Sequence, residues 1–141
     1  MKDFRFKVIL IIQLCAAAGL LTFIAFGRGE WNVQRWAGLI IAIPATILLF
    51  IARFQLGRSF AVRAQAHELV TQGVYSKIRN PIYVFSAFLV LALALTLQNP
   101  AILAFLLILI PVQIVRARKE AAVLEAKFGE QYRRYRQQTW F

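Results

Sequence analysis

The sequence predicts an all-α polytopic membrane protein with about four transmembrane helices. Of its 141 residues, 60% are hydrophobic and 16% are charged, and the mean hydropathy is +0.63. Soluble proteins carry about 25% charged residues. Several apolar runs approach the roughly 20 residues that cross a bilayer as a helix. We therefore expect one integral membrane domain over residues 1–141.

The distribution of basic residues predicts the orientation. Of the 17 Lys and Arg residues, three precede the first apolar run and two lie in the first loop. Five lie in the second loop, none in the third, and seven follow the last run. By the positive-inside rule, this bias places both termini and the second loop in the cytoplasm. Topology and contact with the anionic headgroups of the bilayer thus explain the net charge of +11, and we expect no nucleic-acid partner.

Four apolar stretches define the expected spans: roughly 8–27, 36–53, 82–97 and 101–117. The first is long and has no clear cleavage site, so we expect a retained helix rather than a signal peptide. Pro44 would kink the second. Because Asn99-Pro100 is a turn signal, the last two spans should form a helical hairpin. The alternative, one continuous helix kinked at Pro100, would be far too long.

The last helix should continue past the membrane, because Arg116–Phe128 is strong helix-forming sequence. Beyond it, Phe128, Tyr132 and Tyr135 are spaced to share one helical face. Basic residues and Trp140 surround that face. We expect an amphipathic helix that lies at the membrane surface.

Several kinds of site are excluded by residue content. His67 is the one histidine and Cys15 the one cysteine, so neither a histidine–cysteine metal cluster nor a disulfide framework can be built. A Ser-His-Asp triad of the usual kind is also disfavoured. No glycine-rich nucleotide motif follows a strand, and no phosphate-binding P-loop occurs. We expect no metal.

Two polar clusters remain to carry chemistry, Leu69–Tyr83 and Arg116–Arg136. The first combines a glycine, aromatic hydroxyls and a fixed cation, which suits an organic ligand with a flat ring and polar hydroxyls: Gly73, Tyr75, Tyr83 and Arg79. In the second, Arg116 and Glu120 are one turn apart. A carboxylate there can bind ribose hydroxyls or a ligand cation. Alternatively, the arginines of both clusters only anchor helices to headgroups, and Glu120 pairs with one of them.

Both clusters contain motifs, preceded by a short third one: Gly57-Arg58-Ser59-Phe60; Leu69-Val70-Thr71-x-Gly73-x-Tyr75-x-x-x-Arg79-Asn80-Pro81-x-Tyr83; and Glu120-x-x-x-Leu124-x-x-x-Phe128-Gly129-x-x-Tyr132-x-x-Tyr135. Their order and spacing resemble the isoprenylcysteine carboxyl methyltransferase family, part of a wider group that includes phospholipid N-methyltransferases. The resemblance covers about residues 57–135. It implies S-adenosylmethionine bound in a cytosol-facing pocket, and a membrane lipid or lipidated small-molecule substrate that enters laterally from the bilayer.

The resemblance also implies roles for individual residues. The first cluster would line the cofactor, and Glu120 would close the pocket: Leu69, Val70, Thr71, Gly73, Tyr75, Arg79, Asn80, Pro81 and Tyr83. Arg116 would face the reacting group, so Glu120 and Arg116 are the catalytic candidates. The family often has histidine at the position of Asn80 and a second glutamate at that of Ala121. Asparagine cannot exchange a proton near neutral pH, so a base at that position is lost. The small size resembles prokaryotic proteins and indicates an inner or plasma membrane.

Methyl transfer from a sulfonium is an in-line displacement, which requires attack geometry and exclusion of water. A carboxylate acceptor needs only a cation such as Arg116 to orient it. An amine acceptor must lose a proton, for which Glu120 is the best candidate. Two alternatives remain open, an NADPH-dependent enzyme of the sterol-reductase type and a non-enzymatic membrane scaffold. Cofactor binding separates the three, while the oligomeric state is left open.

Overall fold

The computed structural model describes residues 29–57 and 69–141, together with scattered positions between 8 and 26. Residues 29–57 and 69–141 form four α-helices and one 3-10 helix: α2 (Val33–Leu56), η2 (Gly73–Ser76), α3 (Pro81–Thr96), α4 (Ala101–Phe128) and α5 (Glu130–Gln138). Within this part of the chain there is no β-strand, and one isolated β-bridge joins Ile78 to Trp140. The predicted all-α class is confirmed for these residues.

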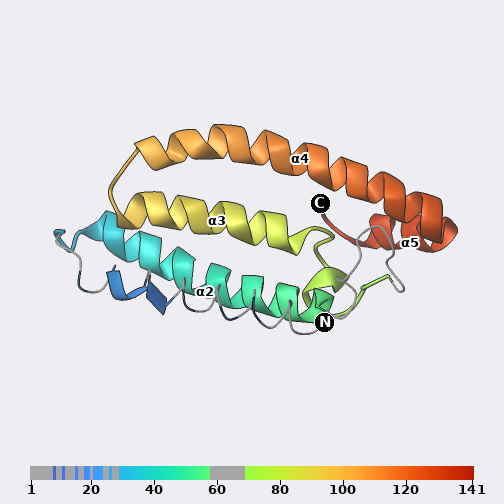
Figure 1. The fold of residues 1–141 in the computed structure, drawn as a ribbon, viewed down its shortest axis with the longest axis horizontal. Helices are drawn as coiled ribbons and strands as arrows, with labels where there is room; N and C mark the ends of the chain where they lie inside the picture. The colour runs from blue at the N-terminus through green and yellow to red at the C-terminus, as the bar shows by residue number, and fades with distance from the viewer. Residues whose placement is uncertain are drawn as a thin grey trace.

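Helices α2, α3 and α4 run side by side, and α3 lies between the other two (Figure 1). By length and composition, α2 and α4 can each cross a membrane. With 16 residues, α3 is shorter, about 24 Å as a helix. The expected first span lies mostly outside the described residues, so the count of four spans stays a prediction.

A tight turn joins α3 to α4. Gln98 adopts a φ of 53°, in the left-handed region that reverses the chain. The side-chain oxygen of Asn99 accepts a hydrogen bond from the Ala101 amide at 3.0 Å. The side-chain amide of Gln98 donates to the carbonyl of Glu30 at 3.0 Å, which ties the turn to the segment before α2. The predicted hairpin is therefore confirmed, and the single kinked helix is excluded.

Small residues line the contact between α2 and α3. Gly38, Ala42 and Ala45 of α2 are buried, as are Ala92 and Thr96 of α3. A Cβ atom at Gly38 would overlap the hydroxyl of Thr96 and lie 2.7 Å from the Thr96 backbone nitrogen. Close approach through small residues is the usual way in which membrane helices associate.

Large apolar side chains cover the outer faces of the same helices. Ile40 and Ile47 of α2 are exposed, as are Leu107 and Ile108 of α4, and Leu107 is 77% exposed. Such a surface would be a liability in water, whereas the hydrocarbon of a bilayer covers it without cost. Small residues inside and large ones outside are thus the arrangement of an integral membrane protein.

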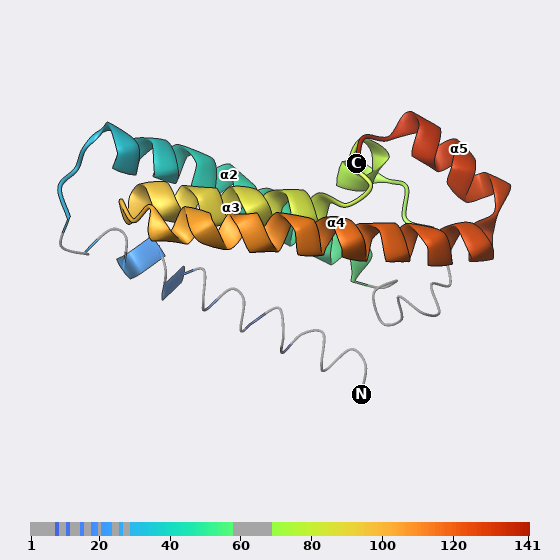
Figure 2. The ribbon, with the colours of Figure 1, turned by 90° about the horizontal axis from the view of Figure 1, so that it is seen from above.

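The far end of α4 extends past α3, as predicted, and the chain then folds back through α5 (Figure 2). Gly129, with a φ of 52°, makes the reversal. An ion pair of 2.8 Å between Glu125 of α4 and Arg133 of α5 holds the two helices together. We call this end of the helical layer the α5 end. Both the chain entering α3 and the last residues of the chain lie there.

We predict that Gly38→Ala destabilises the protein. The added methyl overlaps Thr96, and overpacking of this kind costs about 1–3 kcal/mol. Thermal unfolding in detergent should give a lower midpoint for the variant. Gly19→Ala is the control, because a Cβ there meets nothing within 4 Å. Equal midpoints for wild type and Gly38→Ala would refute the close contact.

Candidate functional site

The first polar cluster begins in close contact with α2. Gly73 has a φ of 62°, and a Cβ atom there would overlap the side chain of Gln55. The backbone amide of Val74 donates to the side-chain oxygen of Gln55 at 3.0 Å. Gly73, expected to line a cofactor, is thus approached closely by a side chain of the protein itself, and its contact with a cofactor stays a prediction.

Tyr75 anchors this cluster in the protein interior. It is buried together with Ala52 of α2 and Ile82 of α3, and Val70 packs against the group. Tyr75 and Val70, both expected to line a cofactor, therefore contribute packing between helices. Of the neighbouring residues expected to line the cofactor, Leu69 is half-buried like Val70, and Thr71 is exposed.

The last two residues of the chain, Trp140 and Phe141, pair with the segment that enters α3. We call these two residues the C-terminal strap. The Trp140 amide donates to the carbonyl of Lys77 at 2.8 Å, and the Arg79 amide donates to the carbonyl of Trp140 at 3.0 Å. Asn80 donates twice to the carbonyl of Phe141, from its backbone at 2.9 Å and its side chain at 3.1 Å. The backbone and the side-chain amide of Asn80 therefore both hold the strap.

A polar chain links α3 to α4 at the same end. The hydroxyl of Tyr83 donates to Oε1 of Glu120 at 2.5 Å. Further into the helices, Gln113 donates to the hydroxyl of Ser86 at 2.8 Å, and Ser86 donates to the carbonyl of Tyr83 at 2.9 Å. Pro81, two residues before Tyr83, begins α3 and is fully buried. Tyr83 and Glu120, from the two separate clusters, are thus brought into direct contact.

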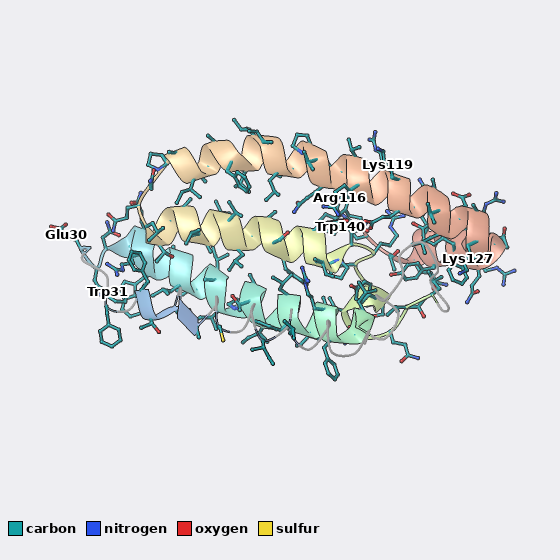
Figure 3. All side chains as sticks on the ribbon, in the orientation of Figure 1. Glu30, Trp31, Arg116, Lys119, Lys127 and Trp140 are labelled. Carbon is teal, nitrogen blue, oxygen red and sulfur yellow. The ribbon has the colours of Figure 1, made fainter. Side chains whose placement is uncertain are left out.

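Arg116 occupies a different environment from Glu120. Gln113 and Ala117 of α4 are buried and Glu120 is half-buried, so these three define the inward face. Arg116 is exposed beside that face, at the same end of the helical layer as Trp140 in Figure 3. Its expected position opposite a reacting group stays a prediction.

An apolar pocket of about 360 Å³ lies between α3 and α4. Tyr83 and Gln113 are its polar members, and the C-terminal strap lines it as well. The α3 residues that line it extend to Leu91, two turns past Tyr83, which corresponds to about 12 Å along the helix. Its complete lining comes from α3, α4 and the strap: Tyr83, Val84, Ala87, Phe88, Leu91, Leu106, Ile110, Gln113, Ile114, Trp140 and Phe141.

The tail turns its aromatic face to the protein, and the expected position of that face on the membrane surface is wrong. Tyr132 is only 3% exposed, and Tyr135 is also buried. The hydroxyl of Tyr135 donates to the carbonyl of Tyr75 at 2.7 Å. The physical reason is that an apolar helical face can be buried by a neighbouring segment as well as by lipid. Here Tyr135 reaches η2, and α5 also contacts α4.

Charged groups of both clusters surround Tyr132. Burial raises the pKa of its hydroxyl, while the nearby charge of Arg79 acts in the opposite direction and Glu120 adds to the rise. Arg79 is half-buried, and its Nε atom is buried with no hydrogen-bond partner in the part of the chain that the structure describes. A buried guanidinium N–H that has no partner can donate a hydrogen bond to an anionic ligand.

Some members of this site could not be recognised from the motifs. Gln113 carries a weak signal, because a polar residue inside an apolar span faces other protein groups or a functional site. Ser86 and the two strap residues carry none, because their positions depend on contacts made over the whole length of the hairpin. The segment Arg58–Glu68, including most of the first motif, lies outside the described residues.

Comparison with known proteins gives the family. Residues 33–131, most of the chain, match the model of the family described as phospholipid methyltransferase. The chain belongs to this family. It is also 29% identical over 143 aligned residues to Protein-S-isoprenylcysteine O-methyltransferase B of Arabidopsis thaliana, with 96% of this chain and 71% of the plant protein covered. No solved structure matches. The predicted family resemblance is therefore confirmed, and this phospholipid methyltransferase family member is a membrane protein of the methyltransferase class.

We predict that Tyr135 titrates near pH 12. Burial, together with the neighbouring Tyr132, raises its pKa from the ordinary value of 10 to about 12. A raised folded-state pKa means that the neutral hydroxyl stabilises the fold fully below pH 10 and loses this effect between about pH 10 and 12. Tyrosinate absorbance should show a late step that Tyr135→Phe removes. A wild-type titration complete near pH 10 in the folded protein would contradict the burial.

Proposed function

We propose that the protein transfers a methyl group from S-adenosylmethionine to a lipid or lipid-like acceptor at the cytoplasmic face of the membrane. One observation carries the proposal: the Tyr83–Glu120 pair lies where an apolar pocket between two membrane helices meets the polar end of the bundle. A reaction between a polar donor and a lipid needs such a junction. Family membership supports the reaction class.

The residues at the α5 end fit the cofactor. The buried Nε of Arg79, which has no hydrogen-bond partner among residues 29–57 and 69–141, suits the carboxylate of the cofactor's amino-acid part. The half-buried carboxylate of Glu120 can accept hydrogen bonds from ribose hydroxyls. When bound, the cofactor would supply an electrophilic methyl group on its sulfonium. The remaining residues proposed to line it are those of the first cluster: Leu69, Val70, Thr71, Gly73, Tyr75, Asn80, Pro81 and Tyr83.

The apolar pocket suits the hydrocarbon chain of the acceptor. A volume of about 360 Å³ falls within the range of about 300–1,000 Å³ that is usual for small-molecule sites. Its length of about 12 Å along α3 approaches the roughly 15 Å depth of one bilayer leaflet. A lipid of the leaflet nearest the α5 end could therefore enter between α3 and α4 without leaving the membrane.

The position of Glu120 favours an amine as the acceptor group. Its carboxylate touches Tyr83, which lines the pocket, whereas Arg116 is exposed to the side. A carboxylate at the mouth attracts a cationic headgroup and can take the proton that the amine must lose. The similarity to the plant isoprenylcysteine O-methyltransferase supports a second candidate, a carboxylate acceptor oriented by Arg116.

The charge distribution supports a cytoplasmic site. The part of α4 near the α5 end carries Arg116, Arg118 and Lys119, and α5 carries further arginines. Positive charge collects on the cytoplasmic side of membrane proteins. The α5 end, and with it Glu120, is therefore proposed to face the cytoplasm, where the donor is available.

We predict that S-adenosylhomocysteine, the product form of the donor, binds saturably to the purified protein. Glu120→Ala should weaken binding at least tenfold, about 1.4 kcal/mol, because a contact to the ribose is lost. Glu130→Ala is the matched control, since that carboxylate is exposed and pairs only at the surface of α5. Titration calorimetry in detergent measures both. A folded protein that binds NADPH instead would support the reductase alternative, and one that binds neither would support a scaffold.

We predict that the transferred methyl group is stable to base. In nanodiscs with tritiated S-adenosylmethionine, phosphatidylethanolamine should be labelled at nitrogen, whereas labelled N-acetyl-S-farnesylcysteine would release methanol as an ester. Glu120→Gln should lower the rate on the amine more than Arg116→Gln does, because only Glu120 accepts its proton. Base-labile label, with Arg116→Gln the more harmful change, would identify the carboxylate acceptor instead.

A further inference from the structure

The C-terminal strap combines a fixed backbone with aromatic rings at the mouth of the pocket. Four hydrogen bonds hold its main chain to residues 77–80. The rings of Trp140 and Phe141 lie 6.0 Å apart, and both line the apolar pocket beside Tyr83. Trp140 is nonetheless 66% exposed. A large ring held in place and left exposed is in position to contact a ligand.

The strap also borders the pocket beside its polar member Tyr83. Its hydrogen bonds go to the segment that leads directly into α3, so the two rings are attached to the element that carries Tyr83. The hydrogen bond from Tyr83 then places Glu120 of α4 next to them. Rings, hydroxyl and carboxylate therefore lie together at the α5 end.

We propose that Trp140 and Phe141 are specificity-determining residues for the acceptor. They wall the end of the pocket where the hydrocarbon chain meets the polar head, and they hold the reacting group beside Tyr83 and Glu120. An aromatic ring with a polar N–H suits this boundary, because tryptophan is enriched where hydrocarbon meets headgroups. The inference rests on the proposed function. It assigns contacts with the acceptor to Trp140 and Phe141, which lie outside the sequence motifs.

In this proposal, the contacts to the acceptor and to the donor come from different residues. The side chains of the strap contribute to the apolar pocket, whereas the nitrogen proposed for the donor is Nε of Arg79, which has no hydrogen-bond partner in the described part of the chain. Replacing a ring by a methyl leaves the backbone hydrogen bonds of the strap in place. Such a variant should lose the aromatic contact with the acceptor and keep the binding site for the donor.

The test compares the kinetics of strap variants in nanodiscs that contain phosphatidylethanolamine. Trp140→Ala and Phe141→Ala should raise KM for the lipid about tenfold, while kcat changes less. The calorimetric Kd for S-adenosylhomocysteine should stay within about twofold of wild type. Trp140→Phe should restore most of the affinity. Phe105→Ala, which removes an exposed ring on the outer face of α4, is the matched control.

Two outcomes would overturn the inference. Unchanged KM in both alanine variants would mean that the rings do not contact the acceptor. A change in the donor Kd as large as that in KM would mean that the strap acts on the donor site or on the fold. Failure of the proposed function is a distinct result, namely no binding of S-adenosylhomocysteine by the wild type.

A second readout does not depend on turnover. With Trp31→Phe and Trp36→Phe, Trp140 is the one remaining tryptophan of the chain's three. Titration with 9,10-dibromostearic acid, whose bromines quench indole, should quench Trp140 saturably. A variant that keeps Trp31 alone, at the opposite end of α2, should be quenched only in proportion to the lipid added. Equal behaviour of the two tryptophans would contradict a lipid contact at the strap.

Discussion

A carboxylate that borders hydrocarbon must have hydrogen-bond partners, and Tyr83 supplies one to Glu120. Burying such a charge without a partner would cost several kcal/mol. This contact joins α3 to α4 at the α5 end, next to the apolar pocket. The site and the packing of the hairpin therefore depend on the same bond, because any change in the crossing of the helices would separate the two groups.

The arrangement of side chains by size makes room for that pocket. The small residues of α2 and α3 pack closely, as at Gly38, so the contact between these helices has little space for a ligand. The α3–α4 contact instead contains larger side chains with a gap between them. A lipid chain can be accommodated there without opening the tighter α2–α3 contact. The close α2–α3 contact thus holds α3 in place, and the more open α3–α4 contact leaves space for a pocket in a protein of only 141 residues.

Much of the fold follows from patterns that are local in the sequence. Asn99-Pro100 predicted the hairpin, and the helix-forming run up to Phe128 predicted the extension of α4. The motif around Gly73 gave no sign that Gln55, far away in the sequence, is the residue that approaches it. The spacing of the tail residues also predicted their shared aromatic face, but it did not predict that Tyr135 would contact Tyr75. Helical periodicity identifies an apolar face and leaves open whether lipid or protein covers it.

The sequence by itself determined the class of the protein, its helical hairpin and its family, because hydropathy, turn residues and motif spacing are properties of short segments. The tertiary structure decided which motif residues meet: Glu120 contacts Tyr83, while Tyr75 became part of the packing. It also brought Trp140 and Phe141 to the pocket, through hydrogen bonds to residues about sixty positions earlier. Such contacts depend on how the helices cross and where the chain returns, and these are set by packing of the whole bundle.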